Sequence, residues 1–136
     1  MSQEEVDAAN RLIIDLISKY RVIIEECRDF DDYELLKEKC DYFLQNEKKE
    51  DVVIISGHAS GADALGERYA QERGFQLKTF PADWKAHGRA AGPIRNARMA
   101  SAANALIAFW DGKSRGTKNM IETAKNHNLK VVVVRY

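Results

Sequence analysis

Residues 52–63 read VVIISGHASGAD, and this stretch decides the fold class. Its first four residues form an unbroken β-branched run, which is typical of a strand buried on both faces of a parallel sheet. Glycines at 57 and 61 follow, and Ser60 and Asp63 are residue types that cap the start of a helix. A strand, a glycine-containing turn and a helix in this order predict one half of a βαβ unit.

The same alternation extends in both directions along the chain. We predict further strands over 21–24, 76–80, 104–109 and 131–134 (the last buried on both faces), and helices over 4–19, 32–46, 61–73, 94–102 and 117–127. Asp31 and Glu34 form a capping box for the second helix, and Pro93 fits the first turn of the fourth. The predicted fold class is α/β, a Rossmann-like three-layer sandwich with a mainly parallel five-stranded sheet and an extra N-terminal helix. We expect residues 1–20 to form that helix and residues 21–136 to form the main domain.

Composition excludes several classes of protein. The length of 136 residues predicts a single domain. Its 21 basic and 21 acidic side chains give a formal net charge of zero. No apolar run approaches the roughly 20 residues of a membrane span, and the acidic start differs from a signal peptide, so we expect no membrane partner. Cys27 and Cys40 form neither a disulfide framework nor a zinc spacing. We expect a cytoplasmic protein without metal or cofactor.

The neutral total hides an uneven distribution of charge. Residues 1–51 hold 15 acidic and 8 basic side chains, whereas residues 52–136 hold 6 acidic and 13 basic ones. Within 81–119, seven basic side chains face two acidic ones. Such a local excess in a neutral protein favours a small anionic ligand and disfavours nucleic acid. The alternative is a solvated basic face without a ligand.

Ligands of open parallel sheets bind beyond the carboxyl ends of the strands, where three segments of this chain are expected to lie. The candidate binding residues of the first segment are Gly57, His58, Ser60, Gly61 and Asp63. Glycines let the backbone approach a ligand closely, and Asp63 either accepts hydrogen bonds from a ribose or caps its helix.

The second and third segments add cations, hydroxyls and an aromatic ring. Candidates in the second are Ser114, Arg115, Gly116 and Thr117, which combine the groups that a phosphate needs at a helix start. Thr117 is alternatively a plain N-cap. Candidates in the third, residues 81–98, are Asp83, Trp84, Arg95, Asn96 and Arg98. Arg95 and Arg98 lie three apart and project from one helix face, and Trp84 either stacks on a nucleobase or packs in the core.

Four stretches of the chain resemble a known family. They are CRDFDDYELL (27–36), GHASGAD (57–63), FPADWKAHGRAAGPIRNARMA (80–100) and NALIAFWDGKSRGTKNMIETA (104–124). Together they are similar to the YspA-like branch of the SLOG superfamily, which also holds the DprA and Lonely Guy proteins. The resemblance covers residues 21–136. It implies a Rossmann-like domain that binds nucleotides or ADP-ribose-type derivatives at the strand carboxyl ends, with Arg28 in the first strand–helix junction as a further candidate.

The match to the Lonely Guy enzymes is partial. Arg95 and Met99 match their Arg-x-x-x-Met stretch, and Gly116 and Thr117 match their Gly-Thr loop. Their catalytic Glu follows the Thr by three residues, whereas Glu122 here follows by five, about 200° further around the helix. The resemblance therefore does not carry a catalytic residue over.

The chain also departs from its branch at three places. Glu26 and Cys27 stand where the branch has a Gly, Ser60 stands where it has an Arg, and Asn104 replaces an Asp. A Glu side chain where backbone approaches a phosphate is expected to repel the phosphate or to demand another ligand geometry.

Three functions follow as hypotheses. The first is binding of a small, phosphate-bearing nucleotide derivative (an ADP-ribose-type or cyclic nucleotide signal). The protein would then act as a stand-alone sensor or as a sequestering protein in phage–bacterium immune signalling. The second is hydrolysis of a nucleotide N-glycosidic bond with Glu122 or Asp63 as the catalytic carboxylate. The third is binding of single-stranded DNA, which the charge balance disfavours.

The N-terminal helix is expected to build an oligomer. Its apolar residues Leu12, Ile13, Ile14, Leu16 and Ile17 are almost consecutive, so they spread beyond the single stripe that one sheet face can cover. We expect a homo-oligomer, at least a dimer, with residues 4–20 in the interface. The alternative is a groove between two other helices of the same chain.

Overall fold

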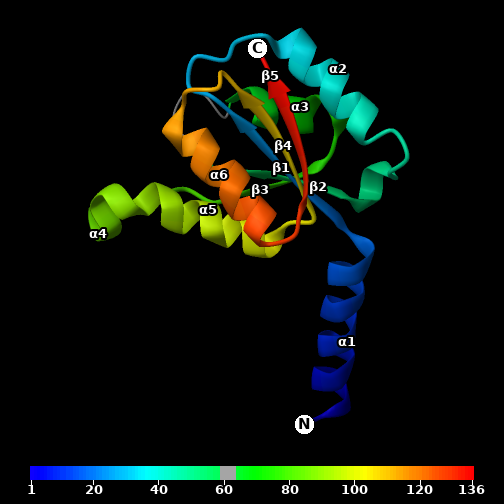
Figure 1. Cartoon of the computed structure of the whole chain (residues 1–136). Coiled ribbons are helices and arrows are strands. Elements are labelled where there is room, and N and C mark those ends of the chain that lie inside the picture. Colours follow the sequence, from blue (N-terminus) through cyan, green and yellow to red (C-terminus); the bar gives the residue numbers. More distant parts are fainter. Residues whose placement is uncertain (59–63) are drawn as a thin grey trace.

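A five-stranded parallel sheet forms the centre of the domain (Figure 1). The computed structural model describes residues 1–58 and 64–136, apart from the side chains of residues 15, 16 and 64. The strands are β1 (Tyr20–Glu26), β2 (Val52–Ser56), β3 (Gln76–Thr79), β4 (Ala105–Trp110) and β5 (Lys130–Arg135). They pair in the order β3-β2-β1-β4-β5, and every pair is parallel. The predicted α/β class is confirmed.

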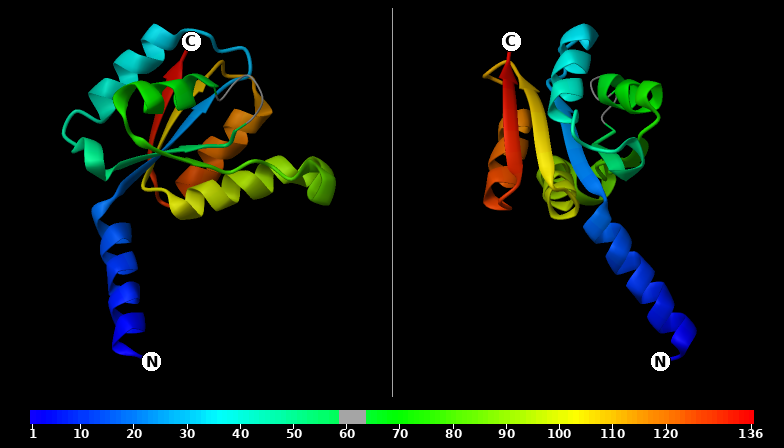
Figure 2. Two further views of the ribbon diagram at one scale, coloured as in Figure 1. Left: turned by 180° about the vertical axis from the view of Figure 1, so that it is seen from behind. Right: turned by 90° about the vertical axis from the view of Figure 1, so that its right-hand side faces the viewer.

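Helices cover both faces of this sheet, which Figure 2 shows edge-on. One face carries α2 (Tyr33–Phe43) and α3 (Ala64–Arg73), and the other carries α5 (Ala91–Ala102) and α6 (Arg115–Asn126). Two 3-10 turns, η1 (Lys49–Asp51) and η2 (Gly88–Ala90), and the short α4 (Trp84–His87) lie in the connections, and α1 (Gln3–Ser18) precedes the sheet. The three-layer sandwich with an extra N-terminal helix is therefore confirmed.

The two apolar layers come from alternate residues of the same strands. Val22 and Ile24 of β1 pack on the α2–α3 side, whereas Ile23 between them packs on the α5–α6 side. All residues of β2 are buried, as the unbroken run at 52–55 predicts. Full burial of a Val or Ile side chain contributes about 1.5–3 kcal/mol, so these strands hold both layers together.

Several predicted boundaries move. The first strand extends to Glu26, two residues beyond the predicted 21–24, so it includes two carboxylates. The N-cap of α2 is Asp32, whose carboxylate accepts from the Leu35 N–H at 3.1 Å, and the prediction of Asp31 as the cap is wrong. Both residue types cap well, and the pattern alone does not separate neighbours that do.

The prediction that the last strand is buried on both faces is wrong. β5 lies at the edge of the sheet, paired with β4 alone in the described part of the chain. Its residues are at most half-buried, and Val133 is exposed. An apolar run reads the same in a central strand as in an edge strand, because the strand order depends on the whole topology.

The third candidate segment, residues 81–98, contains more helix than expected. Its first turn, α4, begins at Trp84, where the carboxylate of Asp83 accepts from the Ala86 N–H at 3.0 Å. The following helix α5 begins at Ala91 and not at residue 94, and Pro93 is still in its first turn. The ring of Trp84 is 61% exposed, which excludes core packing.

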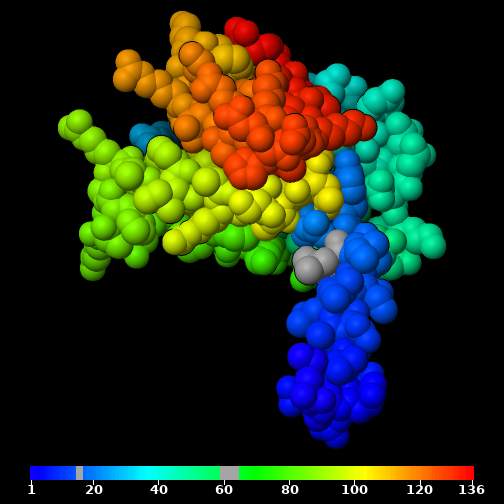
Figure 3. Space-filling view, turned by 60° about the horizontal axis from the view of Figure 1, so that its bottom comes forward, coloured from blue at the N-terminus to red at the C-terminus, as the bar shows by residue number. Residues whose placement is uncertain are grey.

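Helix α1 extends away from the domain, as the ribbon and the space-filling view show (Figures 1 and 3). Leu12, Ile14 and Ile17 are 65%, 62% and 79% exposed, and Ile13 is exposed as well. At its end, Lys19 Nζ donates to the Glu50 carbonyl at 2.8 Å. The alternative of a groove within the same chain is therefore wrong for these four side chains. Among the described residues, no helix is both long and apolar enough to cross a membrane.

Candidate ligand-binding site

A cavity of about 850 Å³ lies at the carboxyl ends of the strands. The chain runs from β1 outward to β2 and β3, and then returns to β4 and β5 on the other side of β1. The connections therefore leave β1 and β4 in opposite directions, and a crevice opens between them, which is where ligands bind in open α/β sheets. The cavity is lined by Glu25, Glu26, Cys27, Arg28, Asp29, Gly57, His58, Pro81, Ala82, Trp84, Arg95, Asp111, Ser114, Gly116 and Thr117.

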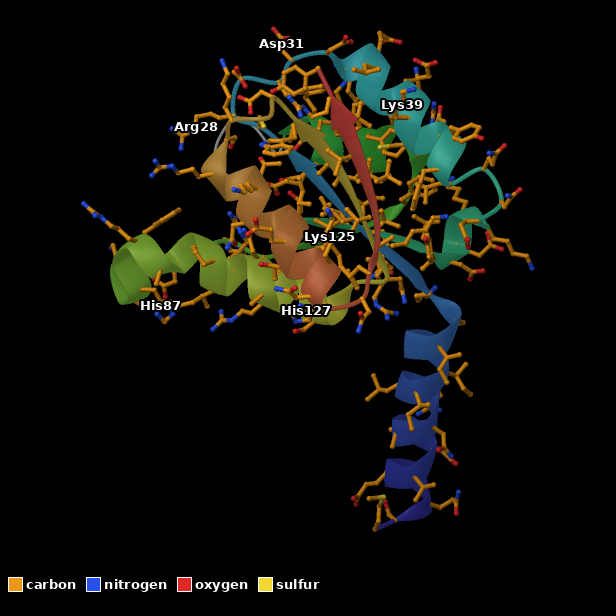
Figure 4. The ribbon with its side chains drawn as sticks, viewed as in Figure 1. Arg28, Asp31, Lys39, His87, Lys125 and His127 are labelled. Atoms are coloured by element: carbon orange, nitrogen blue, oxygen red, sulfur yellow. The ribbon has the colours of Figure 1, made fainter. Side chains whose placement is uncertain are left out.

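The structure brings eight of the predicted binding residues to this cavity, namely Arg28, Gly57, His58, Trp84, Arg95, Ser114, Gly116 and Thr117. Asp83 and Arg98 line an adjoining cavity of about 520 Å³, which shares Pro81, Ala82 and Arg95 with the first. Arg95 and Arg98 thus face the same space, as their spacing predicts. Figure 4 shows Arg28 near the start of α6, at the opposite end of that helix from Lys125 and His127.

Other predicted residues lie elsewhere. Asn96 is buried and its amide donates to Asn119 Oδ1 at 2.9 Å, which ties α5 to α6. The side chain of Arg115 is exposed and outside the cavity lining. Glu122 is exposed on α6 and faces Lys118 at 4.0 Å, also outside the lining. Ser60, Gly61 and Asp63 lie outside the described residues.

The start of α6 presents backbone N–H groups to the cavity. The first N–H of this helix with a helical acceptor is that of Lys118, which donates to the Ser114 carbonyl at 3.1 Å. The N–H groups of Arg115, Gly116 and Thr117 precede it and have no acceptor in the helix. The N-cap is Ser114, so the alternative that Thr117 is the cap is wrong. Within the described residues no side chain caps this end.

Asp111 shapes the turn that leads into α6. Its carboxylate accepts from the backbone N–H groups of Ser114 and Lys113, both at 2.8 Å, and these bonds lower the pKa of the carboxyl below its usual range. Gly112, which follows Asp111 in this turn, has φ +84°, a left-handed conformation that favours glycine. The turn therefore pairs two N–H groups with Asp111, and the next three have no acceptor in the helix.

Cys27 and Thr117 join β1 to α6 at the bottom of the cavity. The Cys27 sulfur lies 3.4 Å from Thr117 Oγ1 and accepts from the Asp111 N–H at 3.4 Å. Both side chains are buried. These contacts fix the start of α6 against the end of β1, and they hold in place the N–H groups that have no acceptor in the helix.

Arg95 closes the other side of the cavity. Its Nη1 donates to the Gly57 carbonyl at 2.8 Å, and its Nε donates to Asn96 Oδ1 at 3.0 Å. A Cβ on residue 57 would lie 2.6 Å from Arg95 Nη1, so any larger residue here would displace the guanidinium from its present position. A guanidinium has five N–H donors, and the two bonds orient it without using all of them.

The amino-acid sequence matches a known family over the segment that supplies ten of the fifteen residues lining this cavity. The model of the YspA, cpYpsA-related SLOG family matches residues 20–87, which run from the start of β1 to the end of α4. This chain belongs to that SLOG family. The gene 61 protein of Mycobacterium phage D29 is 34% identical over 87 residues, which are 60% of this chain and 70% of that protein.

The fold also matches a solved SLOG-type structure. DNA processing protein A (DprA) of Streptococcus pneumoniae has a TM-score of 0.68 to this SLOG protein at 19% identity. The match covers 90% of this chain, which spans about half of the DprA chain (53%). At this identity the likeness shows the Rossmann-like fold alone.

The carboxylates around the SLOG cavity are engaged by the protein. Glu26 is buried, and its Oε1 accepts from the Gly66 N–H at 2.7 Å, so it points toward α3. Asp29 accepts from the Tyr136 hydroxyl at 3.0 Å, and burial, together with this hydrogen bond, raises the pKa of that tyrosine. In contrast, no carboxylate of the described residues lies within ion-pair distance of Arg28. The expected repulsion of a phosphate by Glu26 is thus weakened by the direction of its side chain.

Sequence reasoning missed several residues of the site. Glu25, Asp29 and Asp111 line the cavity because they lie at or just after the ends of β1 and β4. The predicted ends of these two strands could have indicated them. Glu67 of α3 was missed too, although its carboxylate contacts His58 Nδ1 at 3.0 Å. Glu67 lies nine residues after His58 on a predicted helix, and nothing in the sequence pattern indicated that the two side chains meet.

Proposed function

We propose that this SLOG protein binds a small, phosphate-bearing nucleotide derivative, such as an ADP-ribose-type or cyclic nucleotide signal, in the cavity beyond β1 and β4. The family and the DprA-like fold favour a nucleotide-related or DNA-processing function in general. The observation that carries the finer proposal is the convergence on one cavity of a free helix start, two guanidinium groups and an exposed indole ring.

A phosphate fits beside the first turn of α6. The N–H groups of Gly116 and Thr117, which have no acceptor in the helix, and the positive end of the helix dipole favour an anion there. The guanidinium groups of Arg28 and Arg95 add charge-assisted hydrogen bonds, each of which contributes about 1.5–3 kcal/mol. A diphosphate bridge, with four or more oxygens, uses such a set of donors more fully than a single phosphate does.

Trp84 offers a surface for the nucleobase. Its exposed ring lies at the rim of the same cavity, on the α4 turn that extends from the domain (Figure 1). Stacking of a base on an aromatic ring contributes about 1–3 kcal/mol and tolerates any base. The base identity therefore depends on other contacts.

A sensor or a sequestering role fits such a site. Both need tight binding without turnover, and Glu122, the nearest counterpart of a catalytic carboxylate, lies outside the cavity lining. The similarity to a protein of a Mycobacterium phage favours sequestration of a nucleotide signal in phage–bacterium immune signalling. The cytoplasm, where such signals occur and where the buried thiols of Cys27 and Cys40 stay reduced, is the compartment that suits this role.

Calorimetric titration with ADP-ribose, AMP and inorganic phosphate tests the proposal. We expect ADP-ribose to bind more tightly than AMP, and AMP more tightly than phosphate, because each adds contacts along the cavity. Chromatography of the same mixtures after incubation tests the hydrolase alternative, in which a free base accumulates. Equal and negligible heats for all three ligands would contradict binding.

We also propose that α1 mediates self-association. Four large aliphatic side chains of α1, those of Leu12, Ile13, Ile14 and Ile17, are exposed on a helix that stands outside the domain. An isolated 16-residue helix is marginal in water, and most helical stability comes from packing of an apolar face. The acidic first turn with Glu4 and Glu5 and the basic Lys19 beyond the end favour an antiparallel pair with α1 of a second copy.

A further inference from the structure

His58 is held at the edge of the cavity by a network that the proposed phosphate contacts do not use. Its Nδ1 lies 3.0 and 3.2 Å from the two carboxylate oxygens of Glu67. The Ser56 hydroxyl donates to the same carboxylate at 3.0 Å and accepts from the His58 backbone N–H at 3.1 Å. Glu67 is mostly buried, with 18% of its side chain exposed, whereas the imidazole is 58% exposed.

The backbone of His58 is also constrained. Its φ is +54°, in the left-handed region that few residues other than glycine adopt. Such conformations persist where surrounding contacts stabilise them, and they gather at functional sites. Here Ser56 holds the N–H of His58, and Arg95 holds the preceding carbonyl of Gly57. Both bonds hold the peptide group between Gly57 and His58, and the contact with Glu67 holds the ring itself.

The contact with Glu67 determines which nitrogen of the ring faces a ligand. An ionised carboxylate only accepts hydrogen bonds, so in the neutral imidazole the single ring proton resides on Nδ1. The opposite nitrogen, Nε2, then carries a lone pair and needs a donor. Phosphate oxygens do not donate, whereas the hydroxyls of a ribose do. The neutral ring of His58 is therefore suited to the sugar of a nucleotide and not to its phosphate.

We propose that Nε2 of His58 accepts a hydrogen bond from a ribose hydroxyl of the ligand, and that Glu67 is the positioning residue that fixes the required tautomer. The inference rests on the proposed nucleotide binding and adds a specificity: the site distinguishes ribose from deoxyribose. His58 lines the cavity that also holds Arg95 and Gly116, so one nucleotide can reach the sugar contact and the phosphate contacts together. An exocyclic amino group of a base is the other donor that Nε2 could meet.

Nuclear magnetic resonance tests the tautomer without any ligand. Long-range ¹H–¹⁵N spectra of the full chain report which ring nitrogen carries the proton. We expect Nδ1-protonated His58 in the native protein and a mixture of tautomers in Glu67→Gln, whose amide can both donate and accept. A proton on Nε2 of the native protein would overturn the inference whatever the protein binds.

Calorimetry with AMP, 2′-deoxy-AMP and 3′-deoxy-AMP tests the sugar contact. One neutral hydrogen bond corresponds to about a three- to tenfold change in affinity. We expect the native protein to bind one deoxy analogue more weakly by that factor, and Glu67→Gln and His58→Asn to bind all three equally. Asn tolerates the left-handed backbone but is too short to replace the imidazole. His127→Asn, at the far end of α6, is the matched control and should keep the discrimination (Figure 4).

The outcomes separate the two proposals. Equal binding of the three nucleotides by the native protein would overturn the ribose contact and leave nucleotide binding intact. Binding of none of them would contradict nucleotide binding itself. Discrimination that survives in His58→Asn would assign it to another residue and overturn the role of His58. If Glu67→Gln bound AMP more weakly than the native protein but bound inosine monophosphate with unchanged affinity, the donor to Nε2 would be the exocyclic amino group of the base. That result would overturn the ribose contact.

Discussion

Replacement of Gly116 by Glu would place a carboxylate where we expect the ligand's phosphate. Gly116 is the second residue of α6 and lines the cavity. No heavy atom outside its neighbours in the described chain lies within 4 Å of a Cβ built there, and its φ is not in the left-handed region. The side chain therefore enters open space without distorting the helix.

This substitution should raise the stability of the fold and lower the affinity for the ligand. Glu is a better helix former than Gly, by roughly 0.5 kcal/mol. An acidic side chain in the first turn of a helix further stabilises the helix by about 0.3–1 kcal/mol. The variant should thus be at least as stable as the native protein. Two unit charges 4 Å apart repel by about 1 kcal/mol in water and about 4 kcal/mol at the dielectric constant of a protein surface. This repulsion corresponds to a loss of affinity between about fivefold and several hundredfold.

Calorimetry with ADP-ribose and thermal unfolding measure both effects. Gly116→Gln is the matched control, because it has the same shape without the charge, and it should lose much less affinity. High salt should narrow the difference between the two variants, since it screens exposed charges. Native affinity in Gly116→Glu, together with a normal unfolding transition, would refute the placement of the phosphate at α6.

Three further predictions concern other parts of the molecule. Ligand binding should change the tryptophan fluorescence, and Trp84→Ala should remove most of that change while Trp110→Phe keeps it; a signal from Trp110 alone would exclude stacking on Trp84. The Arg73 guanidinium, bonded to Asp41 at 2.6 and 2.9 Å, lowers the pKa of that carboxyl. A lowered pKa stabilises the folded state at pH values above the ordinary aspartate range, and this contribution is lost as the pH falls through the pKa of the folded state. The native protein should therefore have a higher free energy of unfolding in urea than Asp41→Asn at pH 7, and this difference should shrink toward pH 3. A difference that stays constant with pH would contradict the pairing. Light scattering should find a dimer or larger assembly for the full chain and a monomer without residues 1–18, and a monomeric full chain at micromolar concentration would contradict self-association.

The sequence predicted the layers of the fold because its signals are local. The apolar run at 52–55 and the glycine turn after it need no knowledge of distant residues, and the alternation of strands and helices fixes a parallel sheet. The edge position of β5 was missed, because the strand order follows from packing of the complete chain. The exposure of Trp84 was likewise undecided, since the same residue type serves cores and binding sites.

The candidate site was predicted in outline. Strand ends and helix starts indicated Gly116, Thr117 and Arg95, which the structure gathers at one cavity. Arg115 stands beside them in sequence, but successive helical side chains point about 100° apart, so its side chain lies outside the lining. The pairing of His58 with Glu67 joins a loop to a helix face and depends on a backbone angle that no sequence pattern encodes.

Mass spectrometry of the small molecules released from the denatured protein tests the central claim most directly. The native chain and Gly116→Glu are purified side by side from cells that produce nucleotide signals. We predict that the native protein releases a phosphorylated ribonucleotide derivative in an amount close to that of its binding sites, and that the variant releases almost none. Equal release from both proteins, or no nucleotide from either, would contradict the account.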